Sequence, residues 1–197
     1  MLTIVSDTHG TDDHRLTGRT LTAVQEADLV IHAGDFYREP VFEAFSAESE
    51  TLRAVHGNNA DAALRDRLPE TRTVEYAGIR FAVVHTRRGG RTALALFGRE
   101  RGADVVVFGH THRPMVEDAD PVTLLNPGSH TQPRGNRAAH AELEPIADAD
   151  GDPETESRPA GERDGDRTSG LRGRLVTPDG DVFEQFRIDS SGTNRSE

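Results

Sequence analysis

Short runs of apolar residues recur through the first 130 residues and are separated by longer, more polar stretches. Each run is short, most are rich in β-branched residues, and each is bounded by turn residues. Runs of this kind predict buried β-strands. The five predicted strands are Leu2–Val5, Leu29–Ala33, Leu52–His56, Phe81–His85 and Val105–Phe108.

Three of the intervening stretches predict helices: Leu16–Ala27, Val41–Ser46 and Thr92–Arg101. Because strands that are apolar throughout alternate with helices, we expect a layered α/β domain with the helices outside. The segment Glu75–Arg80 around Gly78 predicts a hairpin turn, which adds some antiparallel pairing.

The composition changes in the last third of the chain. Residues 148–170 are crowded with Asp, Glu, Pro and Gly and contain no large apolar side chain, which predicts an acidic disordered insertion. Residues 173–189 predict a closing hairpin with its turn at Pro178-Asp179-Gly180, and the last eight residues are expected to fray. The predicted domain therefore spans residues 1–145 and 171–189.

The composition limits the possible functions. The chain has 197 residues, which suits one domain, and it lacks a membrane-length apolar run and a signal sequence, so we expect a cytoplasmic protein. Without cysteine, disulfides and thiolate metal sites are excluded. A net charge of -11 without a basic cluster argues against a nucleic-acid protein that grips phosphates. All 23 basic residues are arginine, which is typical of halophilic proteins and also of GC-rich codon usage, and the two explanations are compatible.

Polar residues that can bind a metal follow each of the five predicted strands. Residues i and i+2 leaving a strand point the same way, and ligands of open α/β sheets bind beyond the carboxyl ends of the strands. We therefore expect these side chains to converge on one crevice. They are Asp7, His9, Asp35, Asn58, His85, His110 and His112.

Any one of these residues is more often a turn former or a satisfied polar group, but the ordered set is a long composite pattern. Imidazole and carboxylate ligands suit transition metals, and seven donors exceed the needs of one tetrahedral ion. The set fits two divalent ions that share a bridging carboxylate. Manganese is the expected metal, with nickel, iron, cobalt and zinc as alternatives.

The pattern D-x-H, G-D, G-N, H and G-H-x-H resembles the calcineurin-like metallophosphoesterase superfamily, with small bacterial and archaeal phosphodiesterases of the YfcE type as the nearest likeness. The segment "LLNPGSHTQPRG" at 124–135 resembles the Asn-Pro-Gly-Ser loop of that family. The resemblance implies a four-layer α/β/β/α sandwich and a two-metal phosphoesterase, with diesters favoured over monoesters and a metal-bridging hydroxide as nucleophile.

In such a centre the first metal would be held by Asp7, His9 and His112, and the second by Asn58, His85 and His110. Asp35 would bridge the two ions, and Asp35, His85 and Asn58 are the candidate catalytic residues.

Two positions depart from the family pattern and are the candidate substrate-binding residues. Asn59 stands where many members have a histidine that protonates the leaving group, and an amide has no proton to give. Arg87 stands where the second histidine of a His-Gly-His motif is common, and it either faces the substrate phosphate or is a solvated arginine.

The remaining histidines have simpler predicted roles. His32 and His56 are expected in the core and His14 and His140 at the surface, whereas His130 could approach the crevice. Asp13 and Asp61 receive no role.

Besides a phosphoesterase that acts on a small phosphate ester, a non-catalytic metal-binding interaction module of the same fold remains open, as a retromer subunit exemplifies. The completeness of the seven donors favours catalysis, and Asn59 weakly opposes it. The sequence does not identify the substrate, and a homo-oligomer is compatible with it.

Overall fold

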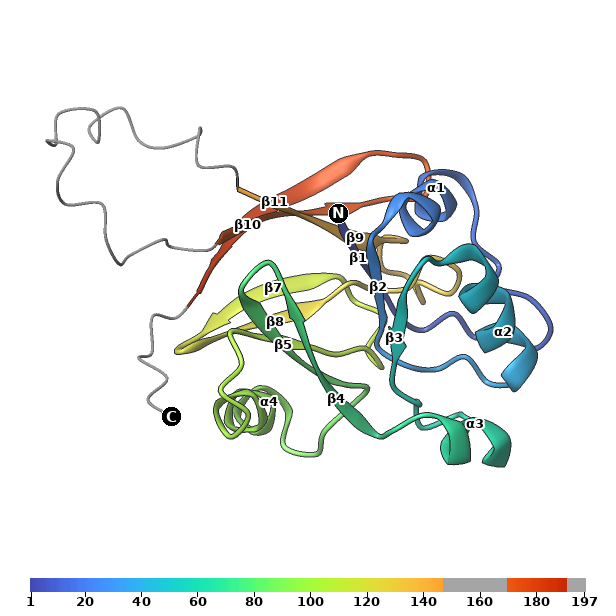
Figure 1. Ribbon diagram of the computed structural model, residues 1–197, viewed down its shortest axis with the longest axis horizontal. Coiled ribbons are helices and arrows are strands. Elements are labelled where there is room, and N and C mark those ends of the chain that lie inside the picture. Colours follow the sequence, from blue (N-terminus) through green and yellow to red (C-terminus); the bar gives the residue numbers. More distant parts are fainter. Residues whose placement is uncertain (147–169, 191–197) are drawn as a thin grey trace, which may run out of the picture.

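The computed structural model describes residues 1–146 and 170–190, which form two packed β-sheets flanked by helices (Figure 1). The first sheet has the strand order β11 (Val182–Asp189), β10 (Gly170–Val176), β9 (His140–Pro145), β1 (Leu2–Val5), β2 (Leu29–His32) and β3 (Leu52–Ala54). The second sheet has the order β4 (Thr71–Tyr76), β5 (Ile79–Val84), β6 (Val105–Val107), β8 (Val122–Asn126) and β7 (Met115–Ala119). The helices are α1 (Gly18–Glu26), α2 (Glu39–Glu48), α3 (Ala62–Arg67) and α4 (Gly90–Arg99).

The central strands are buried on both faces, which explains why they are apolar throughout. In β1, Leu2 and Ile4 pack into the core between the two sheets, whereas Val5 faces the cluster under α1, α2 and α3. In β6, Val106 packs with Phe97 of α4 on the outer face of the second sheet. The order of layers is helices, sheet, sheet and helix, so the predicted α/β/β/α sandwich is confirmed.

The five predicted strands and three predicted helices are all present, with ends within two residues of the predicted ones. The turn at Gly78 joins β4 to β5, and the closing hairpin turns at Pro178-Asp179-Gly180 between β10 and β11. Most of the predicted insertion, 148–169, and most of the predicted frayed end lie outside the described residues. Gly170 is already the first residue of β10.

The sequence pattern does not predict α3, β7, β8 and β9. Helix α3 is only six residues long, and Asp61 caps its N-terminus, where the Asp61 side chain accepts a hydrogen bond from the backbone N–H of Leu64. Strand β8 includes Leu124 and Leu125 from the segment that the sequence predicts to be a loop. No helix in the described part of the chain is long and apolar enough to cross a membrane.

Strand β9 carries charged residues because one of them closes a buried ionic network. Glu142 is buried, and its carboxylate accepts hydrogen bonds from Arg19 of α1 at 2.7 Å and from Arg174 of β10 at 2.6 Å. His140 donates to the same carboxylate at 2.9 Å and contacts the hydroxyl of Thr20 at its other nitrogen. The prediction that His140 lies at the surface is therefore wrong, because this network satisfies a fully buried imidazole.

The network predicts a specific acid sensitivity. Burial raises the pKa of Glu142, but the hydrogen bonds from His140, Arg19 and Arg174 outweigh it and hold the pKa well below its usual range. A carboxyl whose pKa is lowered by folding stabilises the protein fully above its unfolded pKa of about 4.3, and this stabilisation is lost as the pH falls below that value.

We expect Glu142→Gln to lower the free energy of unfolding by about 1–3 kcal/mol at pH 7, with a difference from wild type that shrinks below pH ~4.3. Urea denaturation at several pH values measures this difference. Glu144→Gln, on the same strand but with an exposed side chain, is the control and should change stability by less than about 0.5 kcal/mol. Equal losses in both variants, or a difference independent of pH, would contradict the assignment.

Candidate metal centre

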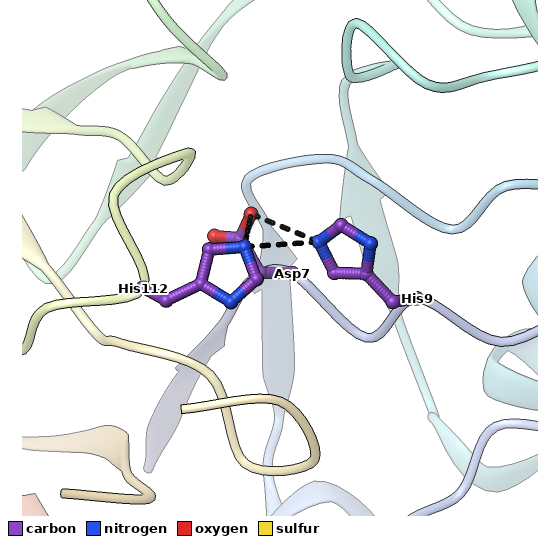
Figure 2. Close-up of side chains that lie close together, drawn as sticks. All are labelled: Asp7, His9 and His112. Carbon is purple, nitrogen blue, oxygen red and sulfur yellow. Dashed lines mark hydrogen bonds and ion pairs between the residues drawn. The ribbon is translucent and has the colours of Figure 1, made fainter. Parts of the chain in front are cut away.

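The loops that follow β1 and β6 bring one carboxylate and two imidazoles together. Asp7 Oδ1 lies 3.5 Å from His9 Nε2 and 3.3 Å from His112 Nε2. The two Nε2 atoms are 3.0 Å apart, and all three side chains are buried (Figure 2). Three ligand atoms that all lie within 4.8 Å of one another can hold one metal ion.

A second group shares Asp7 with the first. Asp35 Oδ2 lies 3.3 Å from His85 Nε2, and Asp7 Oδ1 lies 3.9 Å from the same nitrogen. Asp7, Asp35 and His85 therefore form a second candidate metal group, and all three are buried. Five of the seven predicted ligands belong to these two groups.

The imidazoles are oriented as metal ligands require. His85 Nδ1 lies 2.8 Å from the carbonyl oxygen of Ala33, and His112 Nδ1 contacts the carbonyl oxygen of Gln132. Because a carbonyl only accepts, each Nδ1 carries the proton and each Nε2 turns a lone pair toward the carboxylates. His85 Nε2 is buried and has no hydrogen-bond partner, so a divalent cation fits this donor set.

The two carboxylates are also held in place. Asp7 Oδ2 accepts hydrogen bonds from Ser6 Oγ at 2.8 Å and from the backbone N–H of His110 at 2.9 Å. Asp35 accepts two hydrogen bonds from Asn59, at 3.0 Å from the backbone N–H and 2.8 Å from Nδ2. Burial raises the pKa of Asp35, but a protonated His85 and the two bonds from Asn59 together outweigh burial, so the pKa lies below its usual range.

The other two predicted ligands form a separate pair. His110 Nδ1 lies 2.9 Å from Asn58 Oδ1, and both residues are exposed and outside the two metal groups. The ring of His110 stands at 87° to the ring of His85, with centroids 5.5 Å apart. Asn58 and His110 thus lie beside the second group, and their role as ligands stays a prediction.

Arg87 contacts helix α4. Its guanidinium packs over the ring of Phe97 of α4, 4.9 Å from the ring centroid. Such packing of a planar guanidinium on an aromatic ring is compatible with both roles that the sequence leaves open, so the role of Arg87 in substrate binding stays a prediction.

Three ligand loops repeat one unusual backbone conformation, in which two residues separated by one other have a positive φ. The pairs are Asp7 and His9 at 54° and 50°, Asp35 and Tyr37 at 66° and 75°, and His110 and His112 at 69° and 57°. Side chains converge here because the backbone is left-handed, and not because i and i+2 share one face of an extended strand, as expected from the sequence. Asp and His tolerate this region better than most residues, whereas a tyrosine there is unusual.

Tyr37 is a residue that the sequence pattern does not single out. Its ring meets the ring of His9 edge to face, with centroids 4.6 Å apart. The backbone N–H groups of the first loop bond to the carbonyls of the second, Asp7 to Gly34 and His9 to Asp35, each at 3.0 Å. The two loops therefore run side by side as a continuation of the β1–β2 pair.

Two glycines before predicted ligands allow a close approach that no other residue could make. A Cβ at Gly57 would lie 1.9 Å from Asp35 Oδ1, and a Cβ at Gly109 would lie 2.0 Å from Ser6 Oγ and 2.6 Å from Asp7 Oδ2. The glycines of the G-N and G-H-x-H motifs are thus required by the packing of backbone against the carboxylates.

The Asn-Pro-Gly-Ser loop supports the metal loops through hydrogen bonds to their backbone. Asn126 Nδ2 donates to the carbonyl oxygen of Gly109 at 2.9 Å, and Ser129 Oγ donates to the carbonyl oxygen of Asp7 at 2.7 Å. This loop also supplies the carbonyl of Gln132 that orients His112. Its contribution is to fix the ligand loops relative to each other.

His32 connects the two carboxylate loops, a role that the sequence pattern does not predict. The ring is fully buried, as expected, and stacks on Phe36 with centroids 3.6 Å apart. Its Nδ1 accepts from the backbone N–H of Gly34 at 3.1 Å, so Nε2 carries the proton and donates to Thr8 Oγ1 at 2.9 Å. Thr8 lies between the two ligands of the first loop, and Gly34 precedes Asp35.

The remaining histidines lie outside both metal groups. His56 is half-buried rather than packed in the core, and His14 is half-buried beside Asp13 and Glu48 rather than fully at the surface. His130 is buried near Phe45, and burial lowers its pKa to about 3.

Comparison with known proteins agrees with this geometry. Residues 1–144 match the family model described as the calcineurin-like phosphoesterase superfamily domain. A probable metallophosphoesterase of Methanocaldococcus jannaschii is 34% identical over 139 residues, which cover 68% of this chain and 70% of that protein. A phosphodiesterase of the same organism is 28% identical over 64% of this chain and 81% of its own length. The crystal structure of Vps29 from Entamoeba histolytica with Zn²⁺ superposes with a TM-score of 0.64 at 19% identity and covers 96% of this chain and 99% of that one, which shows a shared fold.

The position of His32 predicts a loss of metal affinity when it is replaced. We expect His32→Gln to weaken Mn²⁺ binding by about 10–100-fold, since residues that orient metal ligands have effects of this size. Competition with a chelating dye measures the affinity. His140→Gln, which also replaces a fully buried, hydrogen-bonded histidine, is the control and should change the affinity less than about threefold. Equal losses of affinity in the two variants would refute a specific role for His32.

Proposed function

The chain belongs to the calcineurin-like phosphoesterase superfamily, and from this premise we propose that it is a two-metal phosphodiesterase that hydrolyses a small phosphate ester. The observation that carries the proposal is the pair of buried carboxylate–imidazole groups that share Asp7. The M. jannaschii relative named as a phosphodiesterase supports diesters as the substrate class.

We assign His9 and His112 to the first ion and His85 to the second, with Asn58 and His110 completing the second site. A carboxylate from Asp7 or Asp35 would bridge the ions. Two divalent ions supply a nucleophile at neutral pH and neutralise the negative charge of the phosphoryl group. Manganese remains our expected metal.

Hydrogen bonds within the protein hold the proposed metal ligands in their orientation before a substrate binds. The hydrogen bonds to His85 and His112 direct both Nε2 atoms to the centre, and the N–H groups of Asn59 keep the Asp35 carboxylate ionised and oriented. Ligands held in this way need little reorganisation during the reaction.

Asn59 leaves the site without a proton donor at this position. Its side chain amide binds Asp35 and cannot protonate a leaving group, so the alcohol must leave with little help from this position. We infer that the enzyme depends on the leaving group being a stable anion.

We also propose that the catalytic domain consists of residues 1–145 and 171–189. Strand β10 pairs with β9 and β11 pairs with β10, so both chain segments contribute to the first sheet. The acidic segment between them would then be an insertion in the connection from β9 to β10.

The second candidate function is a metal-binding interaction module without catalysis. The specific observation in its favour is Asn59, which replaces a proton donor, together with the fold shared with Vps29. Turnover of a phosphodiester by the metal-loaded protein decides between the two functions.

The metal stoichiometry should identify the bridging carboxylate. We expect about two Mn²⁺ per chain in the reconstituted protein. Replacement of the carboxylate that bridges both ions should abolish the binding of both. We therefore compare the metal content of Asp7→Ala and Asp35→Ala by elemental analysis. Asp13→Ala, an exposed acidic residue, is the control and should keep both ions. Full occupancy in both Asp7→Ala and Asp35→Ala would contradict a bridged centre.

The rate should depend steeply on the pKa of the leaving alcohol because Asn59 provides no proton. Across a series of aryl phosphodiesters, kcat/KM should fall as the phenol pKa rises, and alkyl esters should be the slowest. Asn59→His should accelerate the poorest leaving groups most, by about tenfold or more. A wild-type rate that is independent of leaving-group pKa would show that another group donates the proton.

A further inference from the structure

A cavity of about 390 Å³ lies directly beside the second metal group. His85 of that group and its neighbour Asn58 both line the cavity. Arg65 and Glu70 line it as well, and they bring opposite charges to it. Its volume lies within the range of small-molecule sites, which is about 300–1,000 Å³.

Arg65 presents a fixed positive charge to this cavity. It lies on α3, and its Nε donates to the carbonyl oxygen of Ala60 at 2.9 Å while Nη2 donates to the carbonyl oxygen of Asn58 at 2.7 Å. Both partners are neutral, so the guanidinium is held in place without a carboxylate to neutralise it. A guanidinium that is oriented in advance loses less entropy when it binds an anion.

Glu70 presents a negative charge to the same cavity. It lies just before β4, and among residues 1–146 and 170–190 neither Glu70 nor Arg65 forms an ion pair, either with each other or with another side chain. A nearby arginine is neutralised: Arg67, two positions along the same helix, pairs with Glu39 and Glu43 of α2. The cavity is therefore lined by two opposite charges that are not paired with each other.

We propose that Arg65 and Glu70 make this cavity selective for phosphodiesters over phosphomonoesters. This inference rests on the proposed phosphodiesterase function. A diester carries one negative charge, whereas a monoester carries about −1.5 to −2 at pH 7. Arg65 binds the single charge that both esters have, and Glu70 repels the additional charge of the monoester. The cation that selects the substrate is thus Arg65 rather than Arg87.

The test compares Arg65→Gln and Glu70→Gln in the manganese-loaded full chain. Inorganic phosphate at pH 8 is the binding probe, measured by titration calorimetry at saturating Mn²⁺. We expect Arg65→Gln to weaken phosphate binding about tenfold and Glu70→Gln to strengthen it about threefold. Arg67→Gln removes the same charge from the same helix and should change binding less than about twofold. Opposite changes in the two test variants cannot arise from general loosening of the site.

Turnover provides the second arm, with bis(p-nitrophenyl) phosphate as the diester and p-nitrophenyl phosphate as the monoester. Glu70→Gln should lower the ratio of diester to monoester kcat/KM about threefold. If Arg65→Gln binds phosphate as Arg67→Gln does, or Glu70→Gln does not strengthen binding, the selectivity assignment is wrong even when the wild type hydrolyses diesters. If the wild type hydrolyses neither ester but phosphate binding shifts in opposite directions, the proposed function fails and the anion site stands.

Discussion

Two carboxylates buried side by side, Asp7 and Asp35, are the constraint on which the rest of the structure depends. Burying an anion is costly unless hydrogen bonds and positive charge compensate it, and two adjacent anions repel each other as well. The structure gives each carboxylate backbone or side-chain donors and surrounds the pair with imidazole nitrogens whose lone pairs face inward. A divalent cation is the species that completes the balance of charge in such an arrangement.

The backbone around the carboxylates follows from this constraint. Left-handed residues cost about 1–3 kcal/mol each, and they persist only where neighbouring structure holds them. Here the holding elements are the paired β1 and β2 loops, the Asn126 and Ser129 contacts, and the buried His32. The glycines at 57 and 109 remove side chains that would otherwise collide with the carboxylate groups. Six of the nine non-glycine residues with a positive φ in the described part of the chain lie in these three ligand loops.

Much of this could be predicted from the sequence, and the limits have physical causes. Strands buried on both faces are apolar throughout, and the ligand loops begin with Asp, Asn or His where these strands end. Both features can be recognised in the residue pattern, so the sequence predicts the layers and the ligand loops. The left-handed conformation of the ligand loops cannot be recognised in the residue pattern. The expectation that the ligands converge because i and i+2 share one face of a strand was therefore wrong, even though five of the ligands do meet. His140, Tyr37 and His32 contact partners far away in the chain, namely Thr20, His9 and Thr8, and no local pattern indicates those contacts. Strand β9 was missed for the same reason, since Glu142 is polar in sequence and buried only because Arg19 and Arg174 reach it.

Each of the two metal groups takes ligands from both sheets. Asp7, His9 and Asp35 follow strands of the first sheet, whereas His85 and His112 follow strands of the second. Apolar packing in the core between the sheets is non-directional, and a few hydrogen bonds near the ligands, such as that from Ser129 to the carbonyl oxygen of Asp7, add directional contacts. An ion bound there would cross-link both layers at one end of the sandwich. Because these ligands meet only in the folded chain, binding of such an ion would stabilise the whole fold to an extent that rises with the metal supply.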